Sequence, residues 1–292
     1  MRYLIGLLLS LSLVLLSVAF FTLLDRKVLA FGQLRKGPNK IFFLGVVQPL
    51  VDGVKLFVKN FLILKLSSMP LVVVLGFVLL VMMMACWLVI SSGFGLVDSF
   101  VLILVLMVLT GGLVVVSFSL GVAVSSGFSL LGVIRSVVQM VSYEVVLGFA
   151  FIVLVSQGGA VSVLTGIGGF MGFFLIIMVI FSVIMEVNRT PFDFIEGESE
   201  LVAGMVTEFG GLIFSFIFMV EYGMMLFYSI FLSWLVCGGL SVGFVFFLVG
   251  LFSWLRLSFP RFRYDMLVMV GWKVFMPSVM LFSILWWAGL LI

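Results

Sequence analysis

Histidine is absent from the 292 residues, and cysteine occurs only twice. Histidine supplies the usual axial ligands of membrane b-type haems and many ligands of zinc, copper and non-haem iron, so such sites would lack their usual side chain here. Cys86 and Cys237 lie far apart in apolar runs without CxxC spacing, which is typical of small hydrophobic residues. Gly166, Gly168 and Gly169 form no GxGxxG nucleotide motif. We therefore expect no electron-carrying cofactor to be bound by this chain alone.

Charged residues are also scarce, at 9% of the chain, whereas 65% is hydrophobic and the mean hydropathy is +1.48. A soluble domain has too little interior to hide so much apolar side chain. A helix needs about 20 apolar residues to cross a bilayer. The uncharged runs predict an all-α polytopic membrane protein, a single domain over residues 1–292 with about eight transmembrane helices near 4–24, 69–91, 100–121, 136–157, 169–187, 208–231, 235–255 and 272–291.

With these spans, the basic residues gather on one side of the membrane. Fourteen of the fifteen Lys and Arg residues fall in the odd-numbered loops or at the helix ends that border them, and only Arg2 lies opposite. The positive-inside rule places the basic loops in the cytoplasm or matrix and both termini on the far side. We expect protein partners to dock on this basic face.

The first loop contains a segment, 48–61, with the pattern of an amphipathic helix. Asp52, Lys55 and Lys59 share one face, and the opposite face carries Leu50, Val54, Phe57 and Phe61. Such a helix would lie in the membrane surface rather than span the bilayer.

Several acidic residues lie inside or beside the apolar runs; Glu144 and Glu221 fall within predicted spans. A charge at the bilayer centre costs roughly 2.5–3.5 kcal/mol, and a lone buried carboxyl usually avoids this cost by staying protonated. Hydrogen bonding between helices would explain one such residue structurally. A proton or water pathway is favoured here because Arg189 is the only basic residue between 136 and 255, among the acids Glu186, Asp193, Glu196, Glu198, Glu200, Glu208 and Glu221.

The segment 186–200 would be unusual as a mere linker. Pro191 and Gly197 interrupt a helix, and the polar groups are too dense for hydrocarbon. Non-helical polar backbone at membrane depth is tolerated where it lines a cavity or is covered by protein. The segment therefore predicts one of these two environments.

Five motifs follow one another along the chain. They are Asp25–Ala30 with Gln33–Asn39; Gln48-Pro49, Asp52-Gly53 and Lys55-Leu56; Arg135, Gln139 and Ser142–Glu144; Glu186–Val202, followed by Glu208 and Glu221-Tyr222; and Pro260–Asp265 with Gly271–Lys273 and Pro277. Together they resemble the motifs of subunit 1 of NADH–ubiquinone oxidoreductase (respiratory complex I) and of its counterpart in bacteria. The segment from Glu186 to Val202 is the most specific of the five. Asp25, Asn60 and Phe209 depart from residues usual in the family.

The resemblance implies a core membrane subunit of a proton-pumping NADH:ubiquinone oxidoreductase that forms much of the quinone access tunnel. Ubiquinone or a related quinone would be the substrate, and NADH, FMN and iron–sulfur clusters would belong to other subunits. The acids named above, with Glu144, would form the proton and coupling path. Residues implied at the tunnel or its interfaces are Arg26, Arg35, Asp52, Arg189, Phe192, Arg261, Arg263 and Tyr264.

The implied partners are other complex I subunits, membrane lipids and quinone, with no nucleic acid. Composition and length favour the mitochondrial inner membrane over a bacterial plasma membrane.

A stand-alone proton- or ion-coupled transporter is the alternative function; the absence of an internal repeat disfavours it. A passive assembly scaffold is a third possibility, in which the buried acids have no role in turnover. The basic loop residues also have an ordinary interpretation as contacts to anionic lipid.

Overall fold

The computed structural model describes residues 2–41, 43–59, 69–93, 99–124, 127–156, 169–193, 209–237, 239 and 241–290. Every regular element in these ranges is helical, which confirms the all-α expectation. The helices are α1 (Arg2–Gly32), α2 (Gln48–Val58), α3 (Met69–Gly93), α4 (Ser99–Val124), α5 (Gly127–Ser156), α7 (Gly169–Glu186), α9 (Gly211–Cys237), α10 (Val242–Ser258), α11 (Tyr264–Val270) and α12 (Met276–Leu290).

Within the described ranges, six helical stretches are long and apolar enough to cross a membrane: Leu8–Gly32, Pro70–Ile90, Val101–Val124, Ser129–Ser156, Gly211–Cys237 and Tyr264–Leu285. Two shorter apolar helices, Gly172–Glu186 and Val242–Ser258, accompany them. Together these stretches overlap all eight ranges expected from the sequence. The polytopic membrane class is therefore confirmed.

Several helices extend beyond the expected spans. α1 continues to Gly32, so that Arg26 and Lys27 lie within a helix and not in the first loop as expected. α5 begins at Gly127, and the last helical stretch begins at Tyr264. α9 ends at Cys237, later than predicted. The predicted spans stop at the first charged residue, because they are drawn from uncharged runs. The helices continue past that residue, since a long polar side chain near a helix end can reach out of the hydrocarbon.

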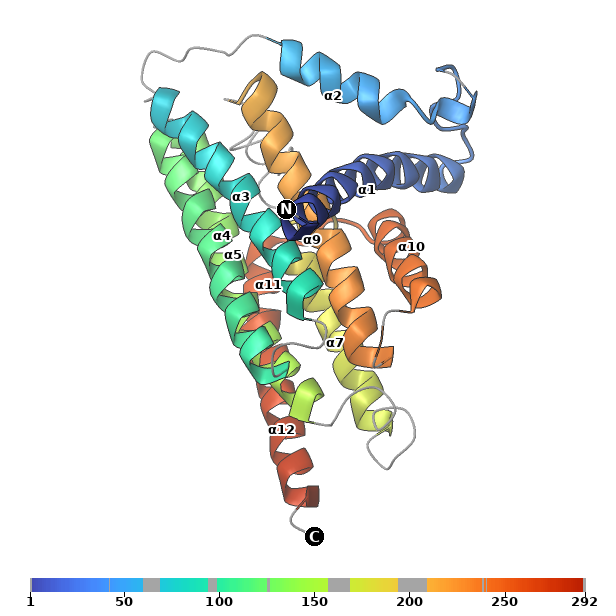
Figure 1. Cartoon of the computed structure of the whole chain (residues 1–292). Coiled ribbons are helices and arrows are strands. Elements are labelled where there is room, and N and C mark those ends of the chain that lie inside the picture. Colours follow the sequence, from blue (N-terminus) through green and yellow to red (C-terminus); the bar gives the residue numbers. More distant parts are fainter. Residues whose placement is uncertain are drawn as a thin grey trace.

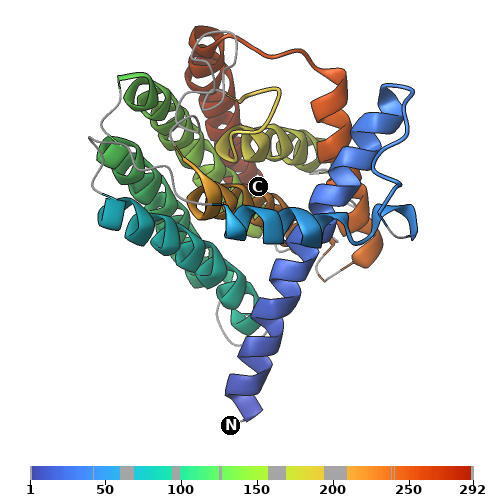
Figure 2. The same ribbon diagram turned by 90° about the horizontal axis from the view of Figure 1, so that it is seen from above.

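Helices α3, α4 and α5 lie side by side, and α9 packs against α1, α3 and α10 (Figure 1). α2 runs across the end of this bundle and contacts the start of α9 (Figure 2). Its side chains Leu50, Val54 and Phe57 are exposed. The amphipathic helix predicted from the sequence is therefore present over Gln48–Val58; the predicted end at Phe61 lies outside the described residues.

Gly211 shows why α9 can begin against α2. Its φ angle is +58°, a conformation that glycine adopts without a Cβ penalty. A Cβ atom there would lie 2.6 Å from the carbonyl oxygen of Lys59. The close approach of the two backbones therefore depends on glycine at this position.

The last helical stretch contains a π-helical turn, Gly271–Phe275, between α11 and α12. Tyr143 of α5 is fully buried beside this turn, and its hydroxyl donates a 2.6 Å hydrogen bond to the carbonyl of Leu267. A Cβ added to Gly271 would lie 3.1 Å from the Tyr143 ring. The contact fixes α5 against the π turn, one residue before Glu144.

Candidate functional site

The chain turns tightly after α7, and a buried glutamine holds this turn. The side-chain amide of Gln139 donates to the carbonyls of Met185 (2.6 Å) and Phe192 (3.2 Å). Asn188 has a φ angle of +52°, which short polar side chains tolerate better than most. The Phe192 amide donates back to the Arg189 carbonyl at 2.8 Å. The turn thus holds Glu186 and Arg189 at fixed positions in the protein interior.

Glu186, the last residue of α7, is buried and meets a tyrosine from α9. The Tyr228 hydroxyl donates a 2.6 Å hydrogen bond to Glu186 Oε1. Glu186 Oε2 and Asn188 Oδ1 have no hydrogen-bond donor within the part of the chain that the structure describes. A buried acceptor without a donor costs about 1–3 kcal/mol, so both oxygens favour a hydrogen-bonding occupant beside them.

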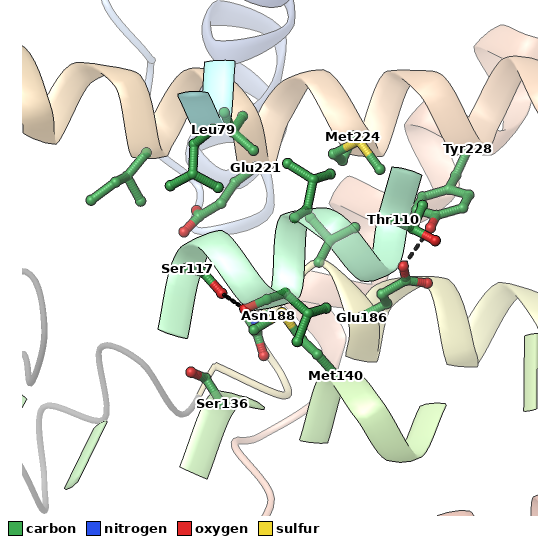
Figure 3. A pocket seen from close by; sticks show the side chains of 15 residues that line it. Leu79, Thr110, Ser117, Ser136, Met140, Glu186, Asn188, Glu221, Met224 and Tyr228 are labelled. Carbon is green, nitrogen blue, oxygen red and sulfur yellow. Dashed lines mark hydrogen bonds between the residues drawn. The ribbon is translucent and has the colours of Figure 1, made fainter. Parts of the chain in front are cut away.

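These groups face a cavity between α3, α4, α5, α7 and α9 (Figure 3). The space measures about 90 Å³, which is room for several water molecules. Apolar side chains form most of the wall, while the polar lining consists of Thr110, Ser117, Ser136, Glu186, Asn188, Glu221 and Tyr228. Glu186 and Glu221, two of the predicted acids, therefore line one shared cavity.

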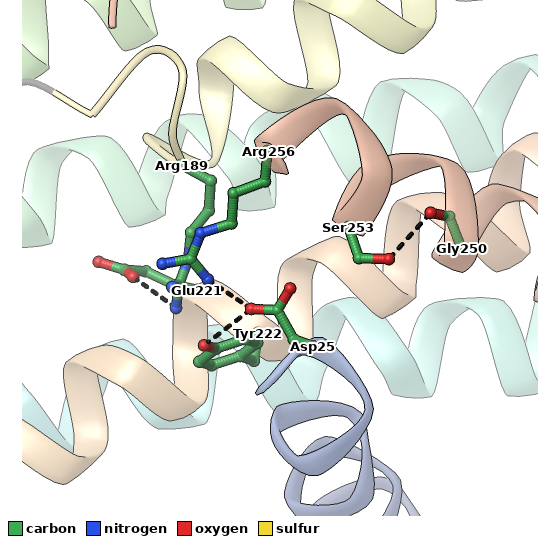
Figure 4. Close-up of polar contacts among 7 residues, drawn as sticks. All are labelled: Asp25, Arg189, Glu221, Tyr222, Gly250, Ser253 and Arg256. Atoms are coloured by element: carbon green, nitrogen blue, oxygen red, sulfur yellow. Dashed lines mark hydrogen bonds and ion pairs between the residues drawn. The ribbon is translucent and has the colours of Figure 1, made fainter. Parts of the chain in front are cut away.

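Glu221 is paired with Arg189 at the edge of this cavity. An Arg189 Nη2 atom lies 3.0 Å from Glu221 Oε2, and the guanidinium carbon lies 3.8 Å from the centre of the Tyr222 ring. The Tyr222 hydroxyl donates to Asp25 of α1 at 3.3 Å, and Asp25 also forms an ion pair with Arg256 of α10 (Figure 4). A continuous polar network thus joins the turn after α7 to three helices.

Glu144 lies near the middle of α5 and faces α4, half-buried. Its Oε1 atom lies 3.5 Å from the Thr110 hydroxyl. A Cβ on Gly111 would lie only 2.8 Å from the same oxygen, so glycine lets the carboxyl lie directly against the α4 backbone. Thr110 also lines the cavity that holds Glu186, which places Glu144 beside that space.

Of the predicted tunnel residues, Arg26 and Asp52 join α1 to α2. Arg26 Nη1 lies 2.5 Å from Asp52 Oδ2, and Gln48 donates to the other Asp52 oxygen at 2.8 Å. Partial burial alone would raise the pKa of Asp52. The hydrogen bonds from Arg26 and Gln48, with the charges of Arg26 and Lys55, outweigh that effect, so the pKa is lowered from its ordinary value of 3.8.

The other predicted tunnel or interface residues lie in two further segments. Phe192 is buried and its ring stacks on Phe262 at 5.3 Å, while the Phe262 amide donates to the Pro191 carbonyl at 3.2 Å. This contact joins the turn after α7 to the segment before α11. Arg35, Arg261 and Arg263 are exposed and Tyr264 is half-buried. Arg263 pairs locally with Asp265 at 3.1 Å.

Four of the predicted acids, Glu196, Glu198, Glu200 and Glu208, lie outside the described residues. Asp193, which precedes them, is buried. Their place in the predicted path therefore stays a prediction. Within the described ranges, no three Asp, Glu or Cys side chains gather as a metal site.

Sequence reasoning missed Tyr228, Asn188 and Arg256. The position of Tyr228 carried a usable signal: it lies seven residues after Glu221, which places both on one face of a helix. The pairing of Arg256 with Asp25 had no such signal, because the partners are separated by 231 residues.

Comparison with known proteins places these residues in a family. Residues 5–288 match the family described as NADH dehydrogenase. NADH-ubiquinone oxidoreductase chain 1 of Heterololigo bleekeri is 38% identical over 283 residues, covering 91% of this chain and 90% of that protein. The corresponding chain of Artemia franciscana is 38% identical over 294 residues, covering 96% of each. The H subunit of the NADH-quinone oxidoreductase of Acidovorax is 34% identical over 311 residues, covering 94% and 87%. The resemblance in the sequence motifs is thus confirmed, and the chain belongs to the NADH dehydrogenase family.

Proposed function

We propose that this chain is the quinone-site membrane subunit of a proton-pumping NADH:quinone oxidoreductase. The relatives are named as chain 1 or as the H subunit of such oxidoreductases, and the matches run over nearly the whole of each chain. The observation that carries the proposal beyond the names is the cavity between the helices that Glu186 and Glu221 share.

The cavity suits a path for protons. Carboxyl groups exchange protons, and water in a polar space can connect groups that do not touch. Glu186 lines the cavity, with one carboxyl oxygen bound by Tyr228 and the other without a partner among the described residues, so a small side-chain movement would let it exchange a proton with water in the cavity. Glu144 lies next to the same space, across Thr110. We propose that Glu144, Glu186 and Glu221 lie on the path, with Asp193, Glu196, Glu198, Glu200 and Glu208 extending it.

The quinone would approach along α2. A long apolar tail can lie against the exposed side chains Leu50, Val54 and Phe57, while the polar face of α2 is held to α1 by the Arg26–Asp52 pair. The stacked rings of Phe192 and Phe262 would place the turn after α7 beside the head-group end of the tunnel. In this proposal Arg35, Arg189, Arg261, Arg263 and Tyr264 complete the tunnel or its interfaces.

Electrons would reach the quinone from other subunits. NADH, FMN and iron–sulfur clusters belong on those partners, and this chain would supply the membrane anchor, the tunnel and the proton path. The mitochondrial inner membrane is the proposed location, although relatives come from both animals and bacteria.

Substitution of the acids in the assembled complex tests the proposal. We expect Glu186→Gln or Glu200→Gln to lower the number of protons moved per NADH oxidised, or to abolish quinone reduction. Ser229→Ala is the control, because its hydroxyl bonds to the Leu226 carbonyl of its own helix. Quinone reductase activity and proton uptake in proteoliposomes are the measurements. Normal turnover with normal pumping in both Gln variants contradicts the proposal and favours a passive scaffold.

A further inference from the structure

Two cavities lie at the same turn of α9. The larger one, described above, is lined by Glu186 and Glu221. The smaller one, of about 10 Å³, is lined by Asp25, Arg189, Tyr222 and Arg256. Glu221 and Tyr222 are adjacent in the chain, yet they line different cavities. Arg189, which lines the smaller cavity and pairs with Glu221 of the larger one, therefore lies between the two spaces.

The geometry of Arg189 is fixed from several directions. Its residue is only 8% exposed. Its guanidinium lies 3.8 Å from the centre of the Tyr222 ring and 5.6 Å from that of Phe218, with Glu221 at 3.0 Å. Residues 218, 221 and 222 share one face of α9, because three- and four-residue spacings bring side chains together on a helix. The planar guanidinium is thus held between a carboxylate and an aromatic face.

Tyr222 is in turn held from its other side. Its hydroxyl donates to Asp25, which is paired with Arg256, and Phe21 packs edge-on against its ring at 5.5 Å. Figure 4 shows Arg189 and Arg256 approaching Tyr222 and Asp25 from different segments. The ring that supports Arg189 is therefore itself anchored to α1 and α10.

An ordinary structural ion pair is the simpler explanation of the Arg189–Glu221 contact. Buried ion pairs, however, add little net stability compared with apolar residues of similar volume. A fixed cation at a narrow point has a second effect, since a positive charge opposes the entry of protons into a water-filled path. The position between two cavities that each have an acidic side chain in their lining makes this second effect relevant.

We propose that Arg189 is a positioning residue that closes the wall between the two cavities and acts as an electrostatic barrier to idle proton passage. The inference rests on the proposed function of the acid-lined cavity. Stacking on Tyr222 keeps the guanidinium in the wall, and the pair with Glu221 holds that carboxylate toward the acid-lined cavity. Removal of the charge, or of the ring beneath it, would connect the two spaces.

Passive proton leak tests this inference. Assembled complex in proteoliposomes is exposed to an imposed proton gradient without NADH, and the leak is measured per assembled complex. We expect Arg189→Gln to raise the leak about tenfold, because tenfold requires the loss of only about 1.4 kcal/mol of barrier. Arg189→Lys should restore part of the barrier, since it keeps the charge but not the planar stack.

A second pair of variants keeps the test decisive if Arg189→Gln fails to assemble. Tyr222→Leu removes the ring face and should raise the leak several-fold more than Tyr222→Phe, which removes only the hydroxyl. Phe231→Leu, which removes a buried ring elsewhere on α9, is the matched control and should leave the leak unchanged.

The outcomes separate the two proposals. If the Arg189 and Tyr222 variants leak no more than the control while Glu186→Gln still impairs pumping, the barrier is refuted and the proposed function stands. If Glu186→Gln and Glu200→Gln also turn over and pump normally, both proposals are refuted. A leak that rises equally in Phe231→Leu shows general loosening of the bundle and overturns the inference as well.

Discussion

Glu186 and Tyr228 form the most direct polar contact in the acid-lined cavity. They come from α7 and α9 and are separated by 42 residues, with a hydroxyl–carboxyl distance of 2.6 Å. The other carboxyl oxygen is buried and has no hydrogen-bond partner among the described residues. Tyr228 therefore sets the orientation of the group that we place on the proton path.

Tyr228→Phe tests this orientation without a change of shape. Loss of the donor should lower coupled quinone reduction several-fold, because the Glu186 carboxyl is no longer held in place by its hydrogen bond. Combined with Glu186→Gln, it should cost nothing further, since contacting residues are not additive. Turnover with proton uptake measures both effects. Additive losses in the double variant would show that Tyr228 acts independently of Glu186.

Gly111 provides a residue-level test of Glu144. Gly111→Ala places a methyl group 2.8 Å from Glu144 Oε1, and the carboxyl must move. We expect proton translocation to fall several-fold. The neighbouring Gly112→Ala is the control, because its added Cβ would lie 3.3 Å from the flexible end of Met82. Equal effects of the two substitutions in a pumping assay would mean that α4 packing, and not Glu144, is responsible.

At the scale of elements, α2 is a helix held by charge on one face and left apolar on the other. The Arg26–Asp52 pair ties it to α1, and the Gly211 turn brings α9 against its end. Because Asp52 has a lowered pKa, its carboxylate stabilises the docked helix at every pH above its ordinary value of 3.8. That contribution is lost only as the pH falls through the lowered pKa.

Hydrogen exchange of the α2 amides tests this anchoring. Between about pH 5 and 8, their protection should not change once the intrinsic pH dependence of exchange is removed, because Asp52 stays ionised there. Asp52→Asn at neutral pH should speed exchange several-fold. Asp265→Asn is the control, since its partner Arg263 is only two residues away in the chain. Unchanged protection in Asp52→Asn would assign the anchoring to α9 alone.

The helices themselves were largely predictable, because a bilayer imposes a length of apolar sequence that few other environments require. The amphipathic α2 followed from the period of its charges. The helix ends did not follow, since Arg26 and Arg135 lie inside helices that continue past the apolar run. The π turn at Gly271–Phe275 had no sequence signal that distinguishes it from an α-helix.

At the scale of the whole molecule, the positions of Glu186 and Glu221 in or beside apolar helices could be predicted, but their partners could not. Arg189 was recognisable as the only base among acids; its stacking on Tyr222 depends on how the turn after α7 meets α9. Asp25 and Arg256 come from distant parts of the chain. Pairings of this kind depend on the packing of helices, which single-sequence periodicity does not encode.

The π turn in the last helical stretch has a consequence for sequence length. A π turn amounts to one extra residue accommodated within an α-helix. Deleting a single residue between Gly271 and Phe275 would restore a regular helix and leave α11 and α12 in their present rotational register. Elsewhere in the stretch, the same deletion would swing everything downstream by about 100°. The chain should therefore tolerate a one-residue deletion better at this turn than elsewhere in the stretch, although the contact between Gly271 and the Tyr143 ring would be lost.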